Sequence, residues 1–301
     1  MKNLVIVESG AKATKITDYL YKNFPNQDWE VAACLGHIRD LSDDETAVNP
    51  NNWPDLFWQE TQKGKKTIRE LRKICKTIDT LYLATDPDRE GEAISWHLFS
   101  DFSDKKLLKE IKVKRITFNE ITPSAIKQAV NSPREIDQDL VDAYLARRIL
   151  DHLIGFKVSP LVWRHAPPAK SAGRVQSPSL RIICERESER DKHQKEEYWP
   201  ISLKLNFEKF IFDADLIKIE ERDVKKEPLS SENEVKDVSK ELKSTTFIVK
   251  TIETKSQSSS PNPPFRTSTL QMTASSFLGF TADRTMRSAQ SLYEAGLITY
   301  L

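Results

Sequence analysis

The chain has 301 residues, 38% of them hydrophobic and 30% charged, with a formal net charge of +1. A chain of this length can bury a sizeable core and ordinarily folds as two or more domains. No stretch approaches the roughly 20 apolar residues of a membrane span, and the amino terminus has a strand pattern instead of a signal peptide, so we expect a soluble, cytoplasmic protein.

The first part of the chain, residues 1–135, alternates strand and helix patterns. Apolar runs predict strands at residues 4–7 and 81–84, and strand patterns also lie at residues 29–33 and 113–118. Helical patterns lie near residues 12–21 and 65–75, after Glu90 and after Pro123. This alternation predicts an α/β domain with a parallel sheet. The polar segment 41–62, which contains Asn49-Pro50-Asn51-Asn52-Trp53-Pro54, is expected to be an irregular excursion at the surface.

Residues 136–192 have a helical pattern. An apolar stripe is formed by Leu140, Val141, Tyr144, Leu145 and Ile149. Positive charge concentrates in this region, so a basic groove is possible in a chain that is nearly neutral overall. The cations are Arg147, Arg148, Arg164, Lys170, Arg174 and Arg181.

Residues 193–260 are predicted to be rich in β-structure. Hydrophobic alternation at residues 201–207 and 210–216 indicates half-buried strands, and residues 245–252 indicate another. The highly charged residues 220–243 are expected to be a connector and an exposed helix. The Ser- and Pro-rich run at 256–264 predicts a hinge-like domain boundary. Residues 261–301 then contain helical patterns at 268–277 and 282–294 that lead to Tyr300.

The three cysteines, Cys34, Cys75 and Cys184, are scattered. Without a Cys-x-x-Cys spacing they argue against a zinc ribbon and a disulfide framework. We expect them to be buried, reduced thiols.

Three acids, Asp86, Asp88 and Glu90, follow the strand predicted at 81–84 and precede a helix. Carboxylates spaced two apart on such a loop can converge, and their repulsion would raise their pKa values unless a hard divalent ion such as Mg²⁺ bound there. The alternative is an acidic helix start that the helix dipole favours.

Glu8 follows the first predicted strand. Ligands of open α/β sheets collect beyond the carboxyl ends of strands, so Glu8 and the Asp86 cluster are expected to share a crevice. The alternative for Glu8 is a surface acid at a helix start.

Several segments together resemble the type IA DNA topoisomerases, whose first domain is a Toprim domain. Two of them are the Toprim acids, in Val7-Glu8-Ser9-Gly10-Ala11-Lys12 and in Asp86-Pro87-Asp88-Arg89-Glu90-Gly91-Glu92. The others, in the order of the family, lie at residues 36–41, 115–122, 171–177, 264–271 and 292–300.

This resemblance covers the whole chain. It implies a Toprim metal-binding domain at 1–135, a helical region that binds single-stranded DNA at 136–192, a β-rich gate or hinge region at 193–260 and the start of a nucleophile domain at 261–301. The chain is then expected to be an amino-terminal fragment that stops just after the nucleophile.

The implied activity is the ATP-independent relaxation of negatively supercoiled DNA by a monomer. It proceeds through cleavage of one strand, a 5′-phosphotyrosine link and strand passage. No Gly-x-x-x-x-Gly-Lys-Ser/Thr loop is present, which agrees with independence from ATP.

The resemblance also implies the site residues. Tyr300 is the nucleophile, Glu8 assists proton transfer and Lys12 offsets phosphate charge. The implied Mg²⁺ ligands are Glu8, Asp86, Asp88 and Glu90. The implied DNA-binding residues are Arg115, Arg147, Arg148, Asp151, Ser171, Arg174 and Gln176. An intrahelical ion pair between Arg148 and Asp151, worth only about a few tenths of a kcal/mol, is the alternative for those two residues.

Two positions depart from the family pattern. His152 stands where many bacterial members have an arginine, so a base preference carried by that arginine is not implied. Gly10 stands where a proline is usual, which loosens the loop before Lys12. Two other functions stay open: a non-catalytic fragment that binds single-stranded DNA, and another Toprim enzyme such as a primase or a nuclease.

Overall fold

The computed structural model of the chain describes residues 2–49 and 56–300. The chain divides into two compact units. The first comprises the residues up to Pro178 together with those from Pro263 onward, and the second is Ser179–Asn262.

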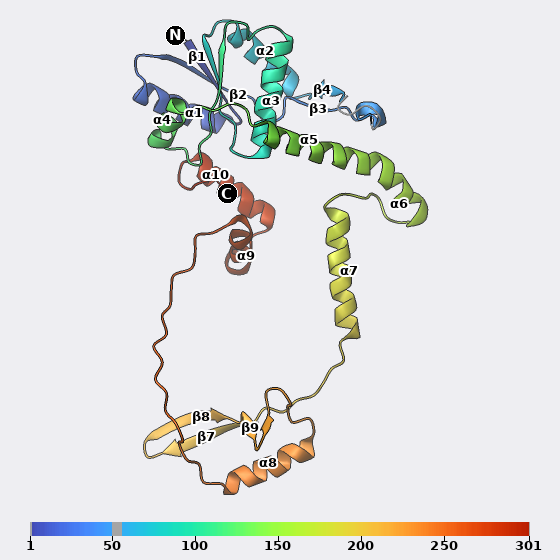
Figure 1. Ribbon diagram of the computed structural model, residues 1–301, viewed down its shortest axis with the longest axis vertical. Coiled ribbons are helices and arrows are strands. Elements are labelled where there is room, and N and C mark those ends of the chain that lie inside the picture. Colours follow the sequence, from blue (N-terminus) through green and yellow to red (C-terminus); the bar gives the residue numbers. More distant parts are fainter. Residues whose placement is uncertain (1, 50–55, 301) are drawn as a thin grey trace. The chain divides into compact units, whose positions relative to one another are not determined.

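A four-stranded parallel sheet forms the centre of the first unit (Figure 1). Its strands are β1 (Lys2–Val7), β2 (Asp28–Ala33), β5 (Thr80–Leu83) and β6 (Lys112–Arg115), in the order β2-β1-β5-β6. All three pairings are parallel. The two central strands, β1 and β5, are largely buried because both faces of the sheet are covered. The edge strands β2 and β6 carry charged residues as well, among them Glu30 and Lys112.

Four helices cover this sheet. On one face lie α1 (Gly10–Asn23) and α4 (Pro123–Asn131), which pack on Val5 and Val7. On the other lie α2 (Gly64–Cys75) and α3 (Arg89–Asp104), which pack on Leu4 and Ile6. After β1 the chain forms β2 on one side of β1, and it later forms β5 on the opposite side of β1. The direction of strand order therefore reverses between β1 and β5. A crevice is expected at the carboxyl ends of these two strands.

The segment 41–62 is more ordered than the sequence suggested. β3 (Arg39–Leu41) and β4 (Trp58–Glu60) form an antiparallel ribbon, and Leu41 and Val48 are buried with Ile149. The expectation of an irregular surface excursion was therefore wrong for these residues, since their apolar side chains close a small core. Residues 50–54 of the Asn-Pro motif lie outside the described residues.

The helices predicted for 136–192 are confirmed. They are α5 (Gln138–Leu153), a short π-helical turn (Ile154–Val158), α6 (Ser159–His165) and α7 (Gln176–Lys192). The Asp137 side chain accepts a hydrogen bond from the Leu140 amide and caps α5. Val141 and Ile149 of the apolar stripe are buried.

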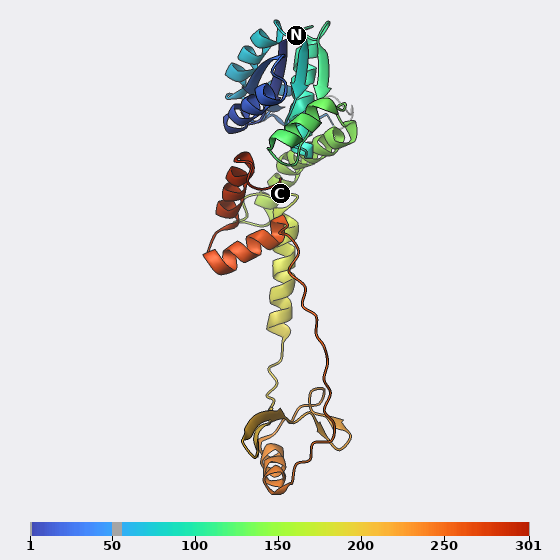
Figure 2. The same cartoon turned by 90° about the vertical axis from the view of Figure 1, so that its left-hand side faces the viewer.

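The second unit contains a β-hairpin and a helix. β7 (Ser202–Phe207) and β8 (Phe210–Asp215) pair antiparallel, followed by the short strands β9 (Lys218–Ile219) and β10 (Arg222–Asp223) and by α8 (Glu232–Ser244). The prediction of a strand at 245–252 was wrong: Figure 2 shows this segment without helix or strand, and no ladder hydrogen bonds hold it. Phe207 and Phe210 are exposed, so the hairpin is not half-buried as expected.

The last part of the chain returns to the first unit. It contains α9 (Thr267–Leu278) and α10 (Ala282–Glu294), as predicted. After α10, Gly296 has a φ of +66°, and a Cβ atom there would lie 2.5 Å from the Ile121 carbonyl oxygen. Only glycine fits this turn, which brings Tyr300 against the sheet.

The cysteine prediction was correct for Cys34 and Cys75, which are buried, and wrong for Cys184, which is exposed; all three are free thiols. In the described part of the chain, no helix is both long and apolar enough to cross a membrane.

Candidate active site

The predicted crevice lies where β1 and β5 end. Glu8 follows β1 and Asp86 follows β5, and the Glu8 carboxylate accepts a hydrogen bond of 3.0 Å from the Asp86 amide. The two strands are adjacent and in register, with Ile6 opposite Leu83. The sheet thereby sets the distance between the two acids.

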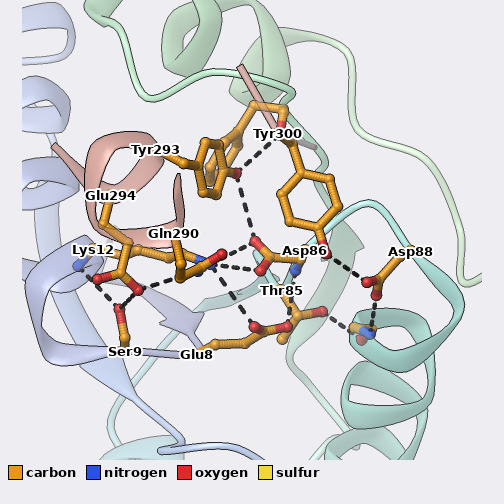
Figure 3. A network of polar contacts seen from close by, with 12 residues as sticks. Glu8, Ser9, Lys12, Thr85, Asp86, Asp88, Gln290, Tyr293, Glu294 and Tyr300 are labelled. Carbon is orange, nitrogen blue, oxygen red and sulfur yellow. Dashed lines mark hydrogen bonds and ion pairs between the residues drawn. The ribbon is translucent and has the colours of Figure 1, made fainter. Parts of the chain in front are cut away.

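Lys12 lies at the centre of this crevice (Figure 3). It belongs to α1, whose N-cap is Ser9, and its side chain is only 1% exposed. Its ammonium donates to both Asp86 oxygens at 2.5 and 2.7 Å and lies 3.8 Å from a Glu8 oxygen. A buried ammonium held by two carboxylates is a compact positive charge in a place of low dielectric.

The Glu8 carboxyl is suited to proton transfer. Burial and the neighbouring Asp86 carboxylate raise the pKa of Glu8 to about 7, although Lys12 acts in the opposite direction. A carboxyl with this pKa is present in both protonation states near neutral pH, which is what general acid–base chemistry requires.

The Tyr300 hydroxyl points into the same crevice. It donates a hydrogen bond of 2.5 Å to Asp88, whose other oxygen accepts from the Gly91 amide and caps α3. The Tyr300 amide donates to the Asn119 carbonyl oxygen at 2.7 Å. Burial, and then the hydrogen bond to Asp88, raise the pKa of Tyr300 above its usual range, so this phenol is neutral.

The segment around Tyr300 is also held by residues that sequence reasoning missed. Ser9 donates to the Glu294 carboxylate at 2.9 Å, and the Lys15 ammonium donates to the Ala295 carbonyl oxygen. Tyr293 is buried between Lys12 and Tyr300 (Figure 3). These residues do not form a recognisable catalytic motif in the sequence. Ser9 and Glu294 are far apart in the chain and meet only in the folded structure.

Of the four predicted metal ligands, Glu8 and Asp86 are in direct contact, Asp88 faces them across the Tyr300 hydroxyl, and Glu90 lies apart. Glu8, Asp86 and Asp88 line the crevice, whereas the exposed Glu90 lies 3.3 Å from the His37 imidazole. Asp86 is held by Lys12 and Asp88 by Tyr300. Among the described residues, no three His, Cys, Asp or Glu side chains are grouped as a metal site.

A polar cavity of about 500 Å³ adjoins the Asp88 loop. Arg148 lines it and forms a bidentate ion pair with Asp40 at 2.7 and 2.8 Å. The intrahelical pair of Arg148 with Asp151 is thus not formed, because the β3–β4 ribbon supplies a better-placed acid. The other lining residues are His37, Asp40, Asp88, Arg89, Glu90, Tyr144, Arg147 and Asp151.

Asp151 instead accepts a hydrogen bond of 2.8 Å from Arg174. Nearby, the Gln176 amide donates to the Ser171 hydroxyl at 3.0 Å. Arg147, Ser171 and Gln176 are exposed. These residues can therefore be reached by a ligand.

Arg115 differs from the other residues expected to bind DNA. It is 1% exposed, and its guanidinium donates to the carbonyl oxygens of Thr85 and Asp86, both at 2.8 Å. It also donates to the Glu92 carboxylate at 3.1 Å. Burial of all these groups gives Arg115 a structural role, fixing the loop after β5, and the expectation that it contacts DNA is corrected.

Glu92 is the counter-ion of this arginine. It is fully buried and also accepts hydrogen bonds from Arg134 at 2.7 and 2.8 Å and from the Asp137 amide at 2.8 Å. Burial alone would raise the pKa of Glu92, but Arg134 and Arg115 lower it below its ordinary value.

The comparisons with known proteins agree with this arrangement. Residues 3–121 match the Toprim domain family and residues 135–301 match the DNA topoisomerase family. The chain therefore belongs to the DNA topoisomerase family, and its Toprim and topoisomerase domains are those of the type IA class.

Individual relatives match over almost the whole chain. It is 45% identical over 298 residues to DNA topoisomerase 1 of Zymomonas mobilis, covering 99% of this chain and 24% of that protein. It is 46% identical over 308 residues to DNA topoisomerase 1 of Rickettsia bellii, covering 99% and 38%. The full-length topoisomerase I structure from Thermotoga maritima matches with a TM-score of 0.77 and 35% identity, covering 99% of this chain and 48% of that one. The chain spans less than half the length of each.

We predict that Glu92→Gln destabilises the first unit. Neutralising Glu92 leaves the Arg115 charge buried without its partner, and breaking such a pair costs about 3–5 kcal/mol. Urea denaturation measures the change in the free energy of unfolding. Glu110→Gln, at an exposed position, is the control and should change it by less than about 0.5 kcal/mol. Equal stability of the two variants would contradict the structural role of Glu92.

Proposed function

We propose that this chain carries the DNA-cleaving site of a type IA topoisomerase that relaxes negatively supercoiled DNA without ATP. The observation that supports it best is the Tyr300 hydroxyl, which lies in a crevice lined by Glu8, Lys12, Asp86 and Asp88, 2.5 Å from the last of these. Asp88 can accept the phenolic proton, and the Glu8 carboxyl and the Lys12 ammonium lie in the same network of polar contacts. A proton acceptor, a proton donor and a cation are the groups that assist attack of a phenol on a phosphodiester.

In the proposed reaction Tyr300 attacks a phosphorus atom of a single DNA strand. A bond forms between the phenolic oxygen and phosphorus, and the bond from phosphorus to the 3′ oxygen breaks, which leaves a 5′-phosphotyrosine. The phenolic proton passes to a carboxylate, and Asp88 already accepts its hydrogen bond. One ester replaces another, so the strand can be rejoined by the reverse reaction without a nucleotide triphosphate.

Glu8 and Lys12 have complementary parts in this proposal. Glu8, with its raised pKa, gives a proton to the departing 3′ oxygen and takes it back on rejoining. Lys12 offsets the negative charge that develops on the phosphate oxygens. Tyr300 is neutral before DNA binds, and a neutral phenol is a poor nucleophile. We therefore expect cleavage to require a bound DNA phosphate whose charge is offset by Lys12.

The strand itself is proposed to lie along the polar cavity beside the Asp88 loop. Arg148 and Arg174 are held in place by Asp40 and Asp151, and both remain partly exposed. Planar guanidinium groups oriented in this way suit bidentate contacts to phosphates. Arg147, Ser171 and Gln176 are proposed to add contacts to the backbone and to one base.

Mg²⁺ is proposed as the cofactor, with Glu8, Asp86, Asp88 and Glu90 as candidate ligands. The oxygen chemistry fits a hard cation. The present arrangement does not fit it as a preformed site, because Lys12 and Tyr300 hold two of the acids and Glu90 lies apart. No step above therefore depends on the ion. Cytoplasmic location and a monomeric state are proposed with the same function.

A covalent-trapping assay tests the nucleophile. We predict that Tyr300→Phe abolishes the protein–DNA adduct in the complete protein, while affinity for single-stranded DNA changes less than about threefold, since only a hydroxyl is lost. The adduct is measured with end-labelled single-stranded DNA after denaturation. An adduct that survives the substitution would refute the assignment of Tyr300. Tight DNA binding with no adduct in the wild type would favour a non-catalytic DNA-binding protein.

The groove is tested through the salt dependence of binding. Arg148→Ala and Arg174→Ala should each weaken binding of single-stranded DNA and lower the slope of log K against log salt by about 0.7. Arg69→Ala, at an exposed position on α2, serves as the control. Unchanged slopes in both groove variants would reclassify these arginines as structural partners of Asp40 and Asp151.

The metal prediction is tested by calorimetry. Asp86→Asn combined with Asp88→Asn should weaken Mg²⁺ binding by about tenfold or more, because amide oxygens lack the charge that holds the ion. Asp86→Asn also leaves the buried Lys12 ammonium without its partner, so Mg²⁺ binding is compared at a temperature at which circular dichroism shows the variant to be folded. Asp104→Asn, at an exposed position in α3, is the control. A double variant with the same Mg²⁺ affinity as the wild type would refute the proposed set of ligands.

A further inference from the structure

Tyr293 is a second tyrosine at the site, and its ring contacts two of the residues proposed above to act in cleavage, Lys12 and Tyr300. The Lys12 ammonium lies 5.2 Å from the centre of the Tyr293 ring. The centres of the Tyr293 and Tyr300 rings are 5.2 Å apart, and the angle between the two ring planes is 68°. Tyr293 is thus in contact with the cation and the nucleophile at once (Figure 3).

Both contacts have the geometry of favourable aromatic interactions. A cation within about 6 Å of a ring centre is attracted by the negative face of the ring. Two rings with centres about 4.5–7 Å apart prefer an edge-to-face arrangement over a stacked one. The ring of Tyr293 therefore constrains the position of Lys12 and that of Tyr300.

The ring matters more than the hydroxyl. Tyr293 is 2% exposed and packs in the same core as Val5 and Val7. Its hydroxyl makes only long contacts, 3.5 Å to Asp86 and 3.4 Å to the Phe118 carbonyl oxygen. Hydrogen bonds of this length are weak.

The chain path explains why one residue can have both contacts. Tyr293 is in the last turn of α10, and the turn at Gly296 brings Tyr300 back over it. The Tyr293 side chain extends from α10 into the core that contains Val5 and Val7, and the Lys12 side chain extends from α1. A side chain at this position links a buried part of the sheet domain to the segment that carries the nucleophile.

We infer that the ring of Tyr293 is a positioning residue for DNA cleavage, holding the Lys12 ammonium and the Tyr300 ring in their mutual arrangement. This inference rests on the proposed function. A nucleophile misplaced by about 1 Å loses on the order of 10²-fold in rate. Loss of the ring should therefore slow cleavage far more than it weakens DNA binding.

The test compares three variants of the complete protein: Tyr293→Leu, Tyr293→Phe and Tyr82→Leu. The last removes another buried aromatic ring of the same core and serves as the control for stability. The rate of adduct formation and the Kd are measured with single-stranded DNA below the melting temperature of every variant.

We expect Tyr293→Leu to form the adduct about 10²-fold more slowly with a Kd within about threefold of the wild type. Tyr293→Phe should retain a rate within about threefold of the wild type, because it keeps the ring, and so should Tyr82→Leu. A wild-type rate in Tyr293→Leu, an equally slow Tyr293→Phe or a parallel loss of DNA binding would overturn the inference. Failure of the wild type itself to form an adduct would instead overturn the proposed function.

If Tyr293→Leu does not fold, fluorinated phenylalanine at position 293 gives the decisive comparison. Ring fluorines leave the shape nearly unchanged and weaken the attraction of the ring for a cation. A trifluorophenylalanine variant that forms the adduct clearly more slowly than Tyr293→Phe supports the inference. Equal rates overturn it.

Discussion

The ion pair between Lys12 and Asp86 is the interaction on which the rest of the site depends. Both groups are buried, with 1% and 7% of their side chains exposed, and the ammonium reaches both oxygens of the carboxylate. A charge in such a place is costly unless it is paired with good geometry. The pair is possible because β1 and β5 are adjacent, so that α1 after the first strand faces the loop after the second. Glu8 and Tyr293 both contact members of this pair, so their environments follow from it, and Tyr293 in turn contacts Tyr300.

Local sequence patterns were sufficient to predict the elements that form this sheet. The central strands β1 and β5 were readable because burial on both faces leaves a continuous hydrophobic run. The alternation of strand and helix patterns then indicated the other elements and placed the acids at the strand ends. The family motifs then placed Glu8, Lys12, Asp86, Asp88 and Tyr300 together, and the structure brings these five residues into one crevice.

Other features depend on contacts between distant residues and could not be read from the sequence. Arg115 belongs to a family motif, yet it is buried against Glu92 instead of facing a ligand. Arg148 pairs with Asp40, which precedes it by 108 residues, and not with the nearby Asp151. At 245–252 the alternating pattern was present but the strand was not, because a strand forms only where a partner supplies its hydrogen bonds.

The segment that carries Tyr300 is held to the sheet domain by a limited set of polar contacts. Ser9 to Glu294, Lys15 to the Ala295 carbonyl, the Tyr300 amide to Asn119 and its hydroxyl to Asp88 are the direct ones outside the Tyr293 hydroxyl. Hydrogen bonds contribute about 1 kcal/mol each in net terms, more where a charge is involved. Attack on DNA would itself remove one of them, since a phosphorylated Tyr300 has no hydroxyl to donate to Asp88. In the proposed reaction, cleavage would therefore weaken the attachment of the nucleophile segment just before the proposed strand passage, which needs that segment to move.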